Sequence, residues 1–293
     1  MQTLRIKFVQ IWQDFNPQDN FVLWILRHKY NVILDNTNYD FVFGAEESHL
    51  GKRSILISGE PHTPKRIWTY DSCLSQFHIE DDKRFVRIPL YIHYLYNFIK
   101  DGSIDSLDYF FRERHNEDIL KTKTSFCNFI ASGQAGEQYR DHFVQKLQKY
   151  KKVDCAGTRH NNVPMVGWAG DNGIANSRVK RDFINKYKFT LAFENTSTKD
   201  GYKGYTSEKL LDAMVANTLP LYWGNVLIEE EFNSKSFINF FNFKDEDEMI
   251  ERIIEVDNND ELYLSYMNSA LSLKNDNLHM DFLIAQMDKI LFG

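Results

Sequence analysis

The 293-residue sequence is poor in residues that mark several protein classes. Its three cysteines, Cys73, Cys127 and Cys155, lie far apart and match neither a disulfide framework nor the spacing of a zinc site. With only 6 prolines and 14 glycines, collagen, flexible linkers and disordered segments are poor fits. Because unpaired cysteines are typical of a reducing compartment, we expect a cytoplasmic protein, or one attached peripherally to the inner face of the membrane.

Long hydrophobic runs and an excess of positive charge are also missing. No stretch approaches the roughly 20 apolar residues of a membrane span, and Arg5 and Lys7 break the N-terminal apolar run, so we expect no transmembrane segment and no signal peptide. Lys and Arg number 35 against 41 Asp and Glu, which gives a net charge of −6. Nucleic-acid-binding domains usually have a pI above about 9. We therefore expect no nucleic-acid partner.

Short β-branched and aromatic runs alternate with longer amphipathic stretches, which predicts parallel sheets covered by helices. In the first half, a helix is expected at 16–28, with Asn16 as N-cap and Pro17 at the first helical position. A charged helical stretch at 90–121 is expected to connect two domains. Strands are expected at 4–9, 31–34, 40–43 and 54–58.

A second α/β series begins at the segment SFCNFIA. Two successive series predict two Rossmann-like domains facing across a cleft, residues 1–121 and 122–293, with the last helix able to pack back on the first domain. Strands are expected at 125–131 and 188–194, and helices at 137–150, near Arg181, and, after the segment LPLYWG, at 245–256, 260–273 and 279–291.

The densest cluster of functional residue types lies between Phe193 and Gly224. A buried strand ends in Glu194 and Asn195, and Thr206 can cap a helix whose first turn holds Glu208 and Lys209. A helix N-terminus attracts phosphate, Lys209 adds a full charge, and Glu208 can accept hydrogen bonds from ribose hydroxyls. The segment predicts a nucleotide diphosphate site. From the residues alone, a capped surface helix with a solvated Glu-Lys pair remains open.

Two residues elsewhere could complete such a site. Glu60 follows the strand-like segment ILISG and precedes Pro61, which places a carboxylate at the end of a strand, where it could take a proton from a hydroxyl. Arg140 lies in the helix expected after SFCNFIAS, at a position that only a family resemblance marks as a diphosphate contact, and its guanidinium suits phosphate oxygens. On sequence position alone, a solvated turn glutamate and a solvated helix arginine are the commoner interpretations.

The segments KYKFTLAFEN and YTSEKLLDAMVANTLPLYWG resemble the donor-site signature of the α-1,3-fucosyltransferases, glycosyltransferase family ten. That signature runs approximately YKF-x-L-x-FEN, then Y-[VI]-TEK, then P-[VI]-x-x-G. The opening at Trp12 to Pro17, the GE turn, RIPLY and the helix after SFCNFIAS extend the resemblance more weakly over nearly the whole chain. It implies a GT-B architecture with an N-terminal acceptor domain and a C-terminal GDP-fucose domain.

The resemblance also implies site residues, by position in the motifs. Because the loop at 196–205 is a few residues longer than in relatives, Tyr202 is an alternative to Tyr205, and Ser207 stands where threonine is usual. The chain lacks the membrane anchor of animal members and the heptad repeats of some bacterial members, so we expect a bacterial or a trimmed form. The implied catalytic base is Glu60, and the implied donor contacts are Arg140, Asn195, Tyr205, Glu208 and Lys209.

The activity implied is that of an inverting α-1,3-fucosyltransferase. It would transfer L-fucose from GDP-β-L-fucose to the GlcNAc of a Galβ1-4GlcNAc (N-acetyllactosamine) acceptor by single displacement. We expect no metal or other cofactor, because two cations and a helix N-terminus can stabilise the departing GDP. The acidic run Asp245 to Asp247 is interpreted as an ordinary helix start. A 1,4 linkage or another acceptor, a different GDP-sugar, and a sugar-binding module without turnover remain alternatives.

Overall fold

The computed structural model forms two compact units, in agreement with the two α/β domains expected. The structure describes residues 1–9, 11, 15–44, 52–59, 69–115, 117–131, 137–166, 173–197 and 203–293, with the backbone alone at 137 and 173–177. Unit 1 comprises Met1–Asn97, Gly201–Tyr205 and Asp276–Gly293, and unit 2 comprises Phe98–Asp200 and Thr206–Asn275. The chain thus first passes between the units at Asn97–Phe98, earlier than the residue 121 expected from the sequence.

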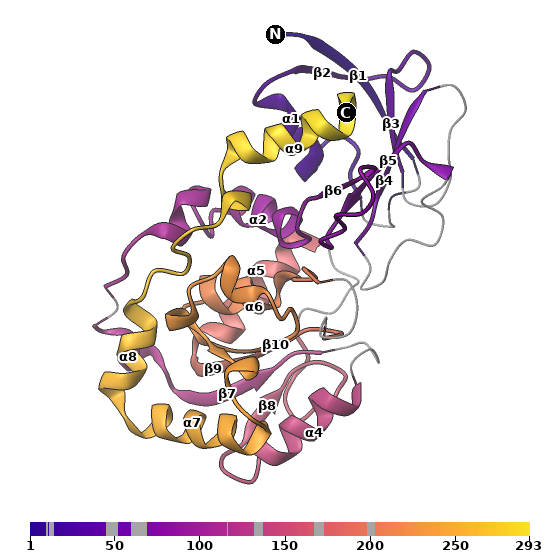
Figure 1. Ribbon diagram of the computed structural model, residues 1–293. Helices are drawn as coiled ribbons and strands as arrows, with labels where there is room; N and C mark the ends of the chain where they lie inside the picture. Colours follow the sequence, from indigo (N-terminus) through magenta and orange to yellow (C-terminus); the bar gives the residue numbers. More distant parts are fainter. Residues whose placement is uncertain are drawn as a thin grey trace. The chain divides into compact units, whose positions relative to one another are not determined.

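A parallel sheet runs through unit 1 (Figure 1). Among the described residues it has six strands in the order β2-β1-β3-β4-β5-β6. Its central strands are buried along their length, as expected of a parallel sheet with both faces covered. The strands are β1 (Thr3–Val9), β2 (Asn31–Leu34), β3 (Phe41–Gly44), β4 (Arg53–Ile57), β5 (Ser72–Ser75) and β6 (Phe85–Arg87).

Helix α1 (Phe21–Arg27) starts later than the sequence predicts, so the assignment of Asn16 as N-cap was wrong. The side chain of Asn20 caps the helix, because its Oδ1 accepts from the backbone N–H of Leu23 at 3.1 Å. Asn16 instead accepts from the N–H of Gln18 at 2.9 Å, which closes a turn before the helix. Asn16 and Asn20 can both accept a hydrogen bond at a helix N-terminus, and in the structure Asn20 is the residue that does so.

The C-terminal helix α9 (Met280–Phe292) belongs to unit 1 and packs against α1. Asp288 accepts from Lys29 Nζ at 2.5 Å and from the Tyr30 hydroxyl at 2.5 Å. Arg53 at the start of β4 donates from Nε to the carbonyl of Ile290 at 3.1 Å. These contacts attach the end of the chain to its first strands.

The parallel sheet of unit 2 has the order β11-β10-β9-β7-β8 among the described residues. Numbered from its own first strand, this is the 2-1-3-4-5 order of doubly wound sheets, and five neighbouring strands of unit 1 repeat it. Ligands of such sheets bind beyond the carboxyl ends of the strands where the order reverses, here β7 and β9. The strands are β7 (Ser125–Phe129), β8 (Val153–Cys155), β9 (Tyr187–Phe193), β10 (Leu219–Trp223) and β11 (Ile238–Asn239).

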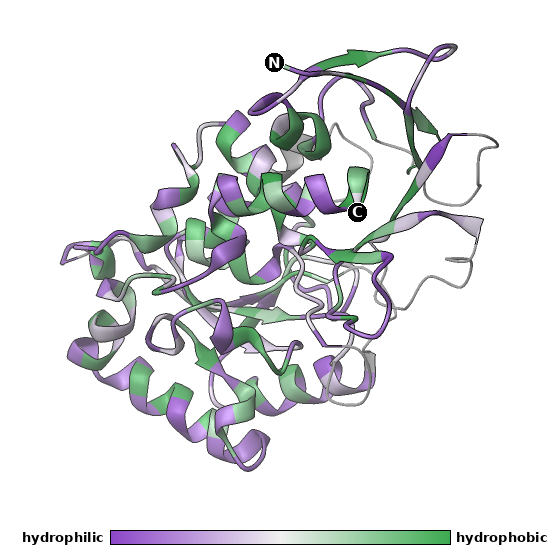
Figure 2. Cartoon of the chain, turned by 45° about the horizontal axis from the view of Figure 1, so that its top comes forward, coloured by the Kyte–Doolittle hydropathy of each residue, from purple (hydrophilic) through white to green (hydrophobic). Residues whose placement is uncertain are grey.

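Helices cover both faces of this second sheet. In Figure 1, α4 and α7 lie on one side of it and α5 and α6 on the other. One core cluster joins Phe143 of α4 and Ile253 of α7 to Phe189 and Leu191 of β9. Figure 2 shows hydrophobic residues along the strands, and hydrophobic and hydrophilic residues alternating along the outer helices. The helices are α3 (Ile119–Thr122), α4 (Glu137–Leu147), α5 (Gly173–Asn185), α6 (Glu208–Val215), α7 (Glu246–Asn258) and α8 (Asp260–Asn268).

The continuous charged helical segment predicted at 90–121 is wrong, since α2 (Tyr91–Lys100) ends early. Gly102 follows with φ +74°, a left-handed conformation that terminates helices. The helix start predicted at the acidic run is confirmed: Asp245 caps α7, accepting from the N–H of Glu248 at 3.1 Å. Within the described part of the chain, no helix is long and apolar enough to cross a membrane.

Candidate functional site

The candidate site of unit 2 is built at the strands where the sheet order reverses. Strands β7 and β9 are neighbours in the sheet. Helix α4, which carries Arg140, follows β7, and Glu194 and Asn195 directly follow β9. Helix α6 comes next and holds Glu208 and Lys209 in its first turn, as the sequence predicts. Chain segments far apart in sequence therefore meet at one carboxyl edge of the sheet.

Glu194 anchors the start of α6. Its carboxylate is fully buried and accepts from the Ser207 N–H at 2.7 Å and from the Ser207 hydroxyl at 2.6 Å. Burial raises the pKa of this carboxyl, against the opposing effects of Lys209 and the Ser207 hydrogen bonds. The predicted cap at Thr206 was wrong by one residue: Ser207 is the N-cap, and Thr206 Oγ1 accepts from Asn225 Nδ2 at 3.2 Å.

Lys209 lies among acceptors at the helix N-terminus. Its Nζ is 3.3 Å from Glu194 Oε2, 3.6 Å from Glu208 Oε1 and 2.8 Å from the Ser207 hydroxyl. Burial alone would lower the pKa of this ammonium, but the two carboxylates more than offset that effect and raise it. Lys209 is therefore a fixed positive charge, with its side chain 15% exposed.

Glu208 is held ionised by two lysines. Burial alone would raise the pKa of its carboxyl, but Lys209 and Lys180 outweigh this and lower it to about 2. Lys180 of α5 lies 3.7 Å from Glu208 Oε1 and 2.7 Å from Asp212 Oδ2. An ionised carboxylate in this position can accept hydrogen bonds from hydroxyl groups.

Arg140 brings a second cation to the same edge. Its side chain is 1% exposed, and its Nη1 donates to Asn195 Oδ1 at 3.1 Å. The two carboxylates raise the pKa of Lys209, and Arg140 opposes them weakly, as a nearby like charge does. Both cations follow neighbouring strands of the sheet, so an anion at this edge could interact with both. The arrangement is suited to a phosphate or diphosphate group.

Gly224 makes room for Glu194 at the end of β10. A Cβ at this position would lie 2.4 Å from Glu194 Cγ, closer than real side chains allow. The backbone there also meets Glu194, whose N–H donates to the carbonyl of Trp223 at 2.8 Å. The glycine that ends the LPLYWG segment is thus explained by close approach to the buried carboxylate.

The structure brings four of the predicted site residues together in unit 2: Arg140, Asn195, Glu208 and Lys209. Tyr205 lies in unit 1, 3% exposed, with its ring stacked on Phe77 at 6.3 Å between centroids. Glu60 and Tyr202 lie outside the described residues.

Three residues of the site were not assigned from the sequence. The sequence did contain a signal for Glu194, because an acidic residue at the end of a buried strand needs hydrogen-bond or charged partners. Ser207 was noted only as a substitution, and Lys180 gave no local signal, because it reaches Glu208 from a separate helix. Among the described residues, no group of three or more His, Cys, Asp or Glu side chains is arranged to hold a metal ion.

Two family models match the chain. The model described as glycosyltransferase family 10 (fucosyltransferase), C-terminal part, matches residues 120–281, more than half of the chain. The model described as the alpha-(1,3)-fucosyltransferase FucT N-terminal domain matches residues 6–94.

Curated relatives carry related descriptions. Alpha-(1,3)-fucosyltransferase FucT of Helicobacter pylori is 29% identical over 299 residues, covering 90% of this chain and 59% of that protein. The 4-galactosyl-N-acetylglucosaminide 3-alpha-L-fucosyltransferase 9 of Mus musculus is 38% identical over 87 residues, covering 29% of this chain and 23% of that protein. This chain therefore spans 59% of the length of the Helicobacter relative.

Solved structures share the fold. An alpha1,3-fucosyltransferase crystallised with GDP has a TM-score of 0.78 at 24% identity, covering 100% of this chain and 91% of that chain. The crystal structure with GDP-fucose has a TM-score of 0.77 at 24% identity, covering 100% and 92%. Together with the two parallel α/β sheets, this likeness confirms the expected GT-B fold class.

Proposed function

Because this chain belongs to glycosyltransferase family 10, we propose that it is an inverting α-1,3-fucosyltransferase. Its donor would be GDP-β-L-fucose, and its acceptor the GlcNAc of a Galβ1-4GlcNAc-type glycan. The name of the mouse relative supports this acceptor, since it states a 4-galactosyl-N-acetylglucosaminide and a 3-alpha-L linkage. The solved relative crystallised with GDP-fucose supports the donor.

The observation that carries the proposal is the pair of cations, Arg140 and Lys209, beside the N-terminus of α6. A diphosphate brings negative charge to all three positive elements at once. That charge grows as GDP leaves, so the same groups stabilise the transition state more than the bound donor. Ionised Glu208 would accept hydrogen bonds from the ribose hydroxyls of the donor.

In the proposed reaction, Glu60 takes the proton of the acceptor hydroxyl as its oxygen attacks the anomeric carbon of fucose. The bond from that carbon to the β-phosphate oxygen breaks, and its electron pair leaves with GDP. A single displacement of this kind converts the β-linked donor into an α-fucoside. We propose that no metal is required, because Arg140, Lys209 and the helix N-terminus supply the charge.

The direct test is to incubate the purified chain with GDP-fucose and N-acetyllactosamine and to analyse the products by chromatography and NMR. We expect GDP release together with a trisaccharide carrying α-fucose on O3 of GlcNAc, unaffected by EDTA. Fucose on O4 of a type 1 disaccharide would instead establish the 1,4 linkage, and transfer from GDP-mannose would establish another donor. GDP-fucose binding without any product across the acceptor panel would overturn the enzymatic proposal in favour of a binding module.

The same proposal places the protein in the cytoplasm. Cys73, Cys127 and Cys155 are all free and buried in the structure. Free thiols persist in a reducing compartment, which supports this location.

A further inference from the structure

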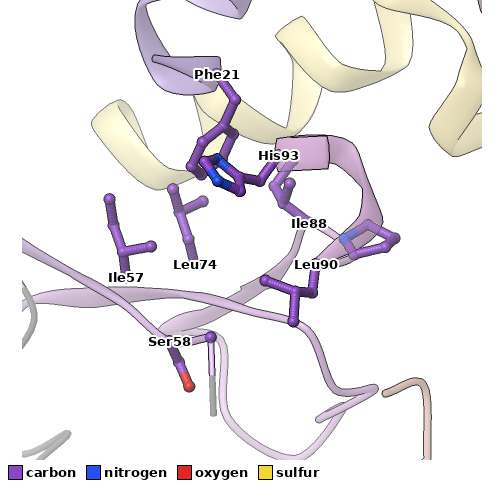
Figure 3. Close-up of a pocket in the computed structure, with 9 residues that line it drawn as sticks. Phe21, Ile57, Ser58, Leu74, Ile88, Leu90 and His93 are labelled. Atoms are coloured by element: carbon purple, nitrogen blue, oxygen red, sulfur yellow. The ribbon is translucent and has the colours of Figure 1, made fainter. Parts of the chain in front are cut away.

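A small pocket opens at the carboxyl ends of β4 and β5 in unit 1 (Figure 3). Its space is about 320 Å³, including the open mouth. Figure 3 shows Phe21 and His93 at one end of it and Ser58 at the other. Much of the wall between them consists of the aliphatic side chains of Ile57, Leu74, Ile88 and Leu90.

The pocket is suited to a small, uncharged, apolar group. The lining residues carry no acidic, lysine or arginine side chain, and the His93 ring lies edge-on to Phe21, with centroids 5.6 Å apart. Of the pocket's space, about 20 Å³ can be occupied by a water-sized group, which is enough for about one such group. Along the aliphatic part of the wall, sugar hydroxyls would lose their water without gaining hydrogen-bond partners, which is unfavourable. The pocket therefore suits one apolar substituent of a sugar.

The position of the pocket in the chain points to the acceptor. Ser58 and Gly59 line it, and the next residue is Glu60, the base of the proposed function. In GlcNAc, the acetamido group is on C2, the carbon next to C3, whose hydroxyl would give its proton to that base. A GlcNAc presented to residue 60 would thus carry its acetyl group close to the reacting oxygen.

We infer that this pocket receives the N-acetyl methyl group of the acceptor GlcNAc and selects 2-acetamido sugars over sugars with a free 2-hydroxyl. The Ser58 hydroxyl, at the end of the pocket away from Phe21, can hydrogen-bond the amide of the same group. This inference rests on the proposed function, because it uses the assignment of Glu60 and of a glycan acceptor.

The first experiment compares kcat/KM for N-acetyllactosamine with kcat/KM for lactose, in which glucose replaces GlcNAc. We expect a preference of about tenfold or more for N-acetyllactosamine, the scale at which an apolar pocket discriminates between substrates that differ by one apolar group. Equal use of both would overturn the pocket assignment while leaving the fucosyltransferase proposal intact. Transfer to neither would count against the proposed function, and the pocket would then be judged by binding.

Acceptor binding is measured by saturation-transfer NMR of the whole chain with GDP and N-acetyllactosamine, which shows which acceptor protons lie closest to the protein. If the methyl group enters the pocket, its resonance should receive more saturation than the ring protons of GlcNAc. Stronger saturation of the ring protons than of the methyl group would overturn the inference, whether or not the chain turns over.

The variant test enlarges the pocket with Leu90→Ala and uses Leu34→Ala as its control. Both leucines are half-buried residues of unit 1, and Leu34 lies in β2, outside the pocket lining. Leu90→Ala should raise about tenfold the use of an N-butanoyl acceptor relative to the N-acetyl acceptor, and Leu34→Ala should not. An unchanged ratio in Leu90→Ala would overturn the inference.

Gly59→Ala gives a second variant should Leu90→Ala fail to fold. A Cβ at residue 59 would lie 3.6 Å from Leu90 Cδ1, an ordinary contact that narrows the pocket without a clash. This variant should lower the use of the N-butanoyl acceptor relative to the N-acetyl one. A rise in that ratio would contradict the assignment.

Discussion

The buried Glu194 forms an ion pair with Lys209, with 3.3 Å between Oε2 of the glutamate and Nζ of the lysine. Glu194 directly follows β9, and Lys209 lies in the first turn of α6, the next helix in the chain. The pair fixes the ammonium beside a helix N-terminus before any ligand arrives. Preorganised charge of this kind favours an anion, because little reorganisation is needed when the anion binds.

Replacing Lys209 by methionine should weaken GDP binding about tenfold or more, because it removes a charge-assisted contact while keeping a side chain of similar length. The affinity would be measured by isothermal titration calorimetry, with a thermal melt to confirm folding. Lys146→Met is the matched control, since Lys146 pairs with Glu246 and Asp247 at 3.3 and 2.7 Å, away from the candidate site. Equal GDP affinity in the Lys209 variant and the wild type would remove Lys209 from the donor site.

Ser207→Ala should destabilise unit 2, whereas Ser207→Thr should not. Alanine deletes the hydroxyl that donates to Glu194 at 2.6 Å, and a hydrogen bond to a charged group contributes about 1.5–3 kcal/mol. Threonine keeps the hydroxyl and is the residue usual in this motif. The free energy of unfolding would be measured by urea titration. If the alanine variant is as stable as the threonine variant, the hydroxyl does not anchor the helix.

Gly224→Ala should both destabilise the protein and weaken GDP binding, because its Cβ would collide with Glu194 at 2.4 Å. Overpacking of this kind costs about 1–3 kcal/mol. Gly102→Ala is the control: Gly102 has φ +74° and no atom within 4 Å of a Cβ, so it should cost about 1 kcal/mol from backbone strain and leave GDP affinity unchanged. Equal GDP affinities of Gly224→Ala and Gly102→Ala would contradict the proposal that the contact between Gly224 and Glu194 supports the GDP site.

Glu60→Gln should reduce turnover by a factor of about 100 or more while leaving GDP affinity nearly unchanged, because an amide cannot accept the acceptor proton. The measurement is kcat with GDP-fucose and N-acetyllactosamine, alongside GDP titration of the same sample. The exposed Glu80 supplies the control, as Glu80→Gln should keep full activity. A parallel loss of GDP binding in Glu60→Gln would exclude a role confined to proton transfer.

Unit 1 should lose stability as the pH falls from 6.5 to 4 because of His78. Burial, assisted by Arg87 and opposed by Glu80, lowers the pKa of His78 from 6.5 to about 4. In that window the unfolded chain binds a proton that the folded chain does not, so the free energy of unfolding decreases as the pH falls. His78→Gln should flatten this dependence, as followed by urea titration at several pH values. If the free energy of unfolding of His78→Gln depends on pH as strongly as that of the wild type, other groups cause the dependence.

The alternation of apolar strands and amphipathic stretches was sufficient to predict most elements of the fold. The strand predicted at 31–34 coincides with β2, and the one predicted at 188–194 lies within one residue of β9. The short strands β5, β6 and β11 were missed, because runs of two to four residues carry little periodicity. Helix starts were misplaced where neighbouring polar residues compete as caps, as with Asn16 and Asn20.

The donor site was predicted from sequence motifs, so the prediction could include only residues that lie within those motifs. Arg140, Asn195, Glu208 and Lys209 each matched a motif position, and the structure gathers them in unit 2. Lys180 was not found, because nothing near it in sequence shows that it will face Glu208 across two helices. The packing of Tyr205 on Phe77 could not be predicted from the sequence either, because the two residues lie far apart in the chain.

The amino-acid sequence by itself determined the chemistry that depends on neighbours along the chain: the strand end with Glu194 and Asn195, the helix start with Glu208 and Lys209, and the motif that joins them. Tertiary structure alone decided which charges face one another and which remain ionised. Burial and pairing depend on side chains brought together from separate elements, so the pKa of Glu208 near 2 follows from Lys209 and Lys180 together. The tertiary structure also shows that α9 belongs to unit 1, because Lys29 and Arg53, which contact α9, come from the first part of the chain.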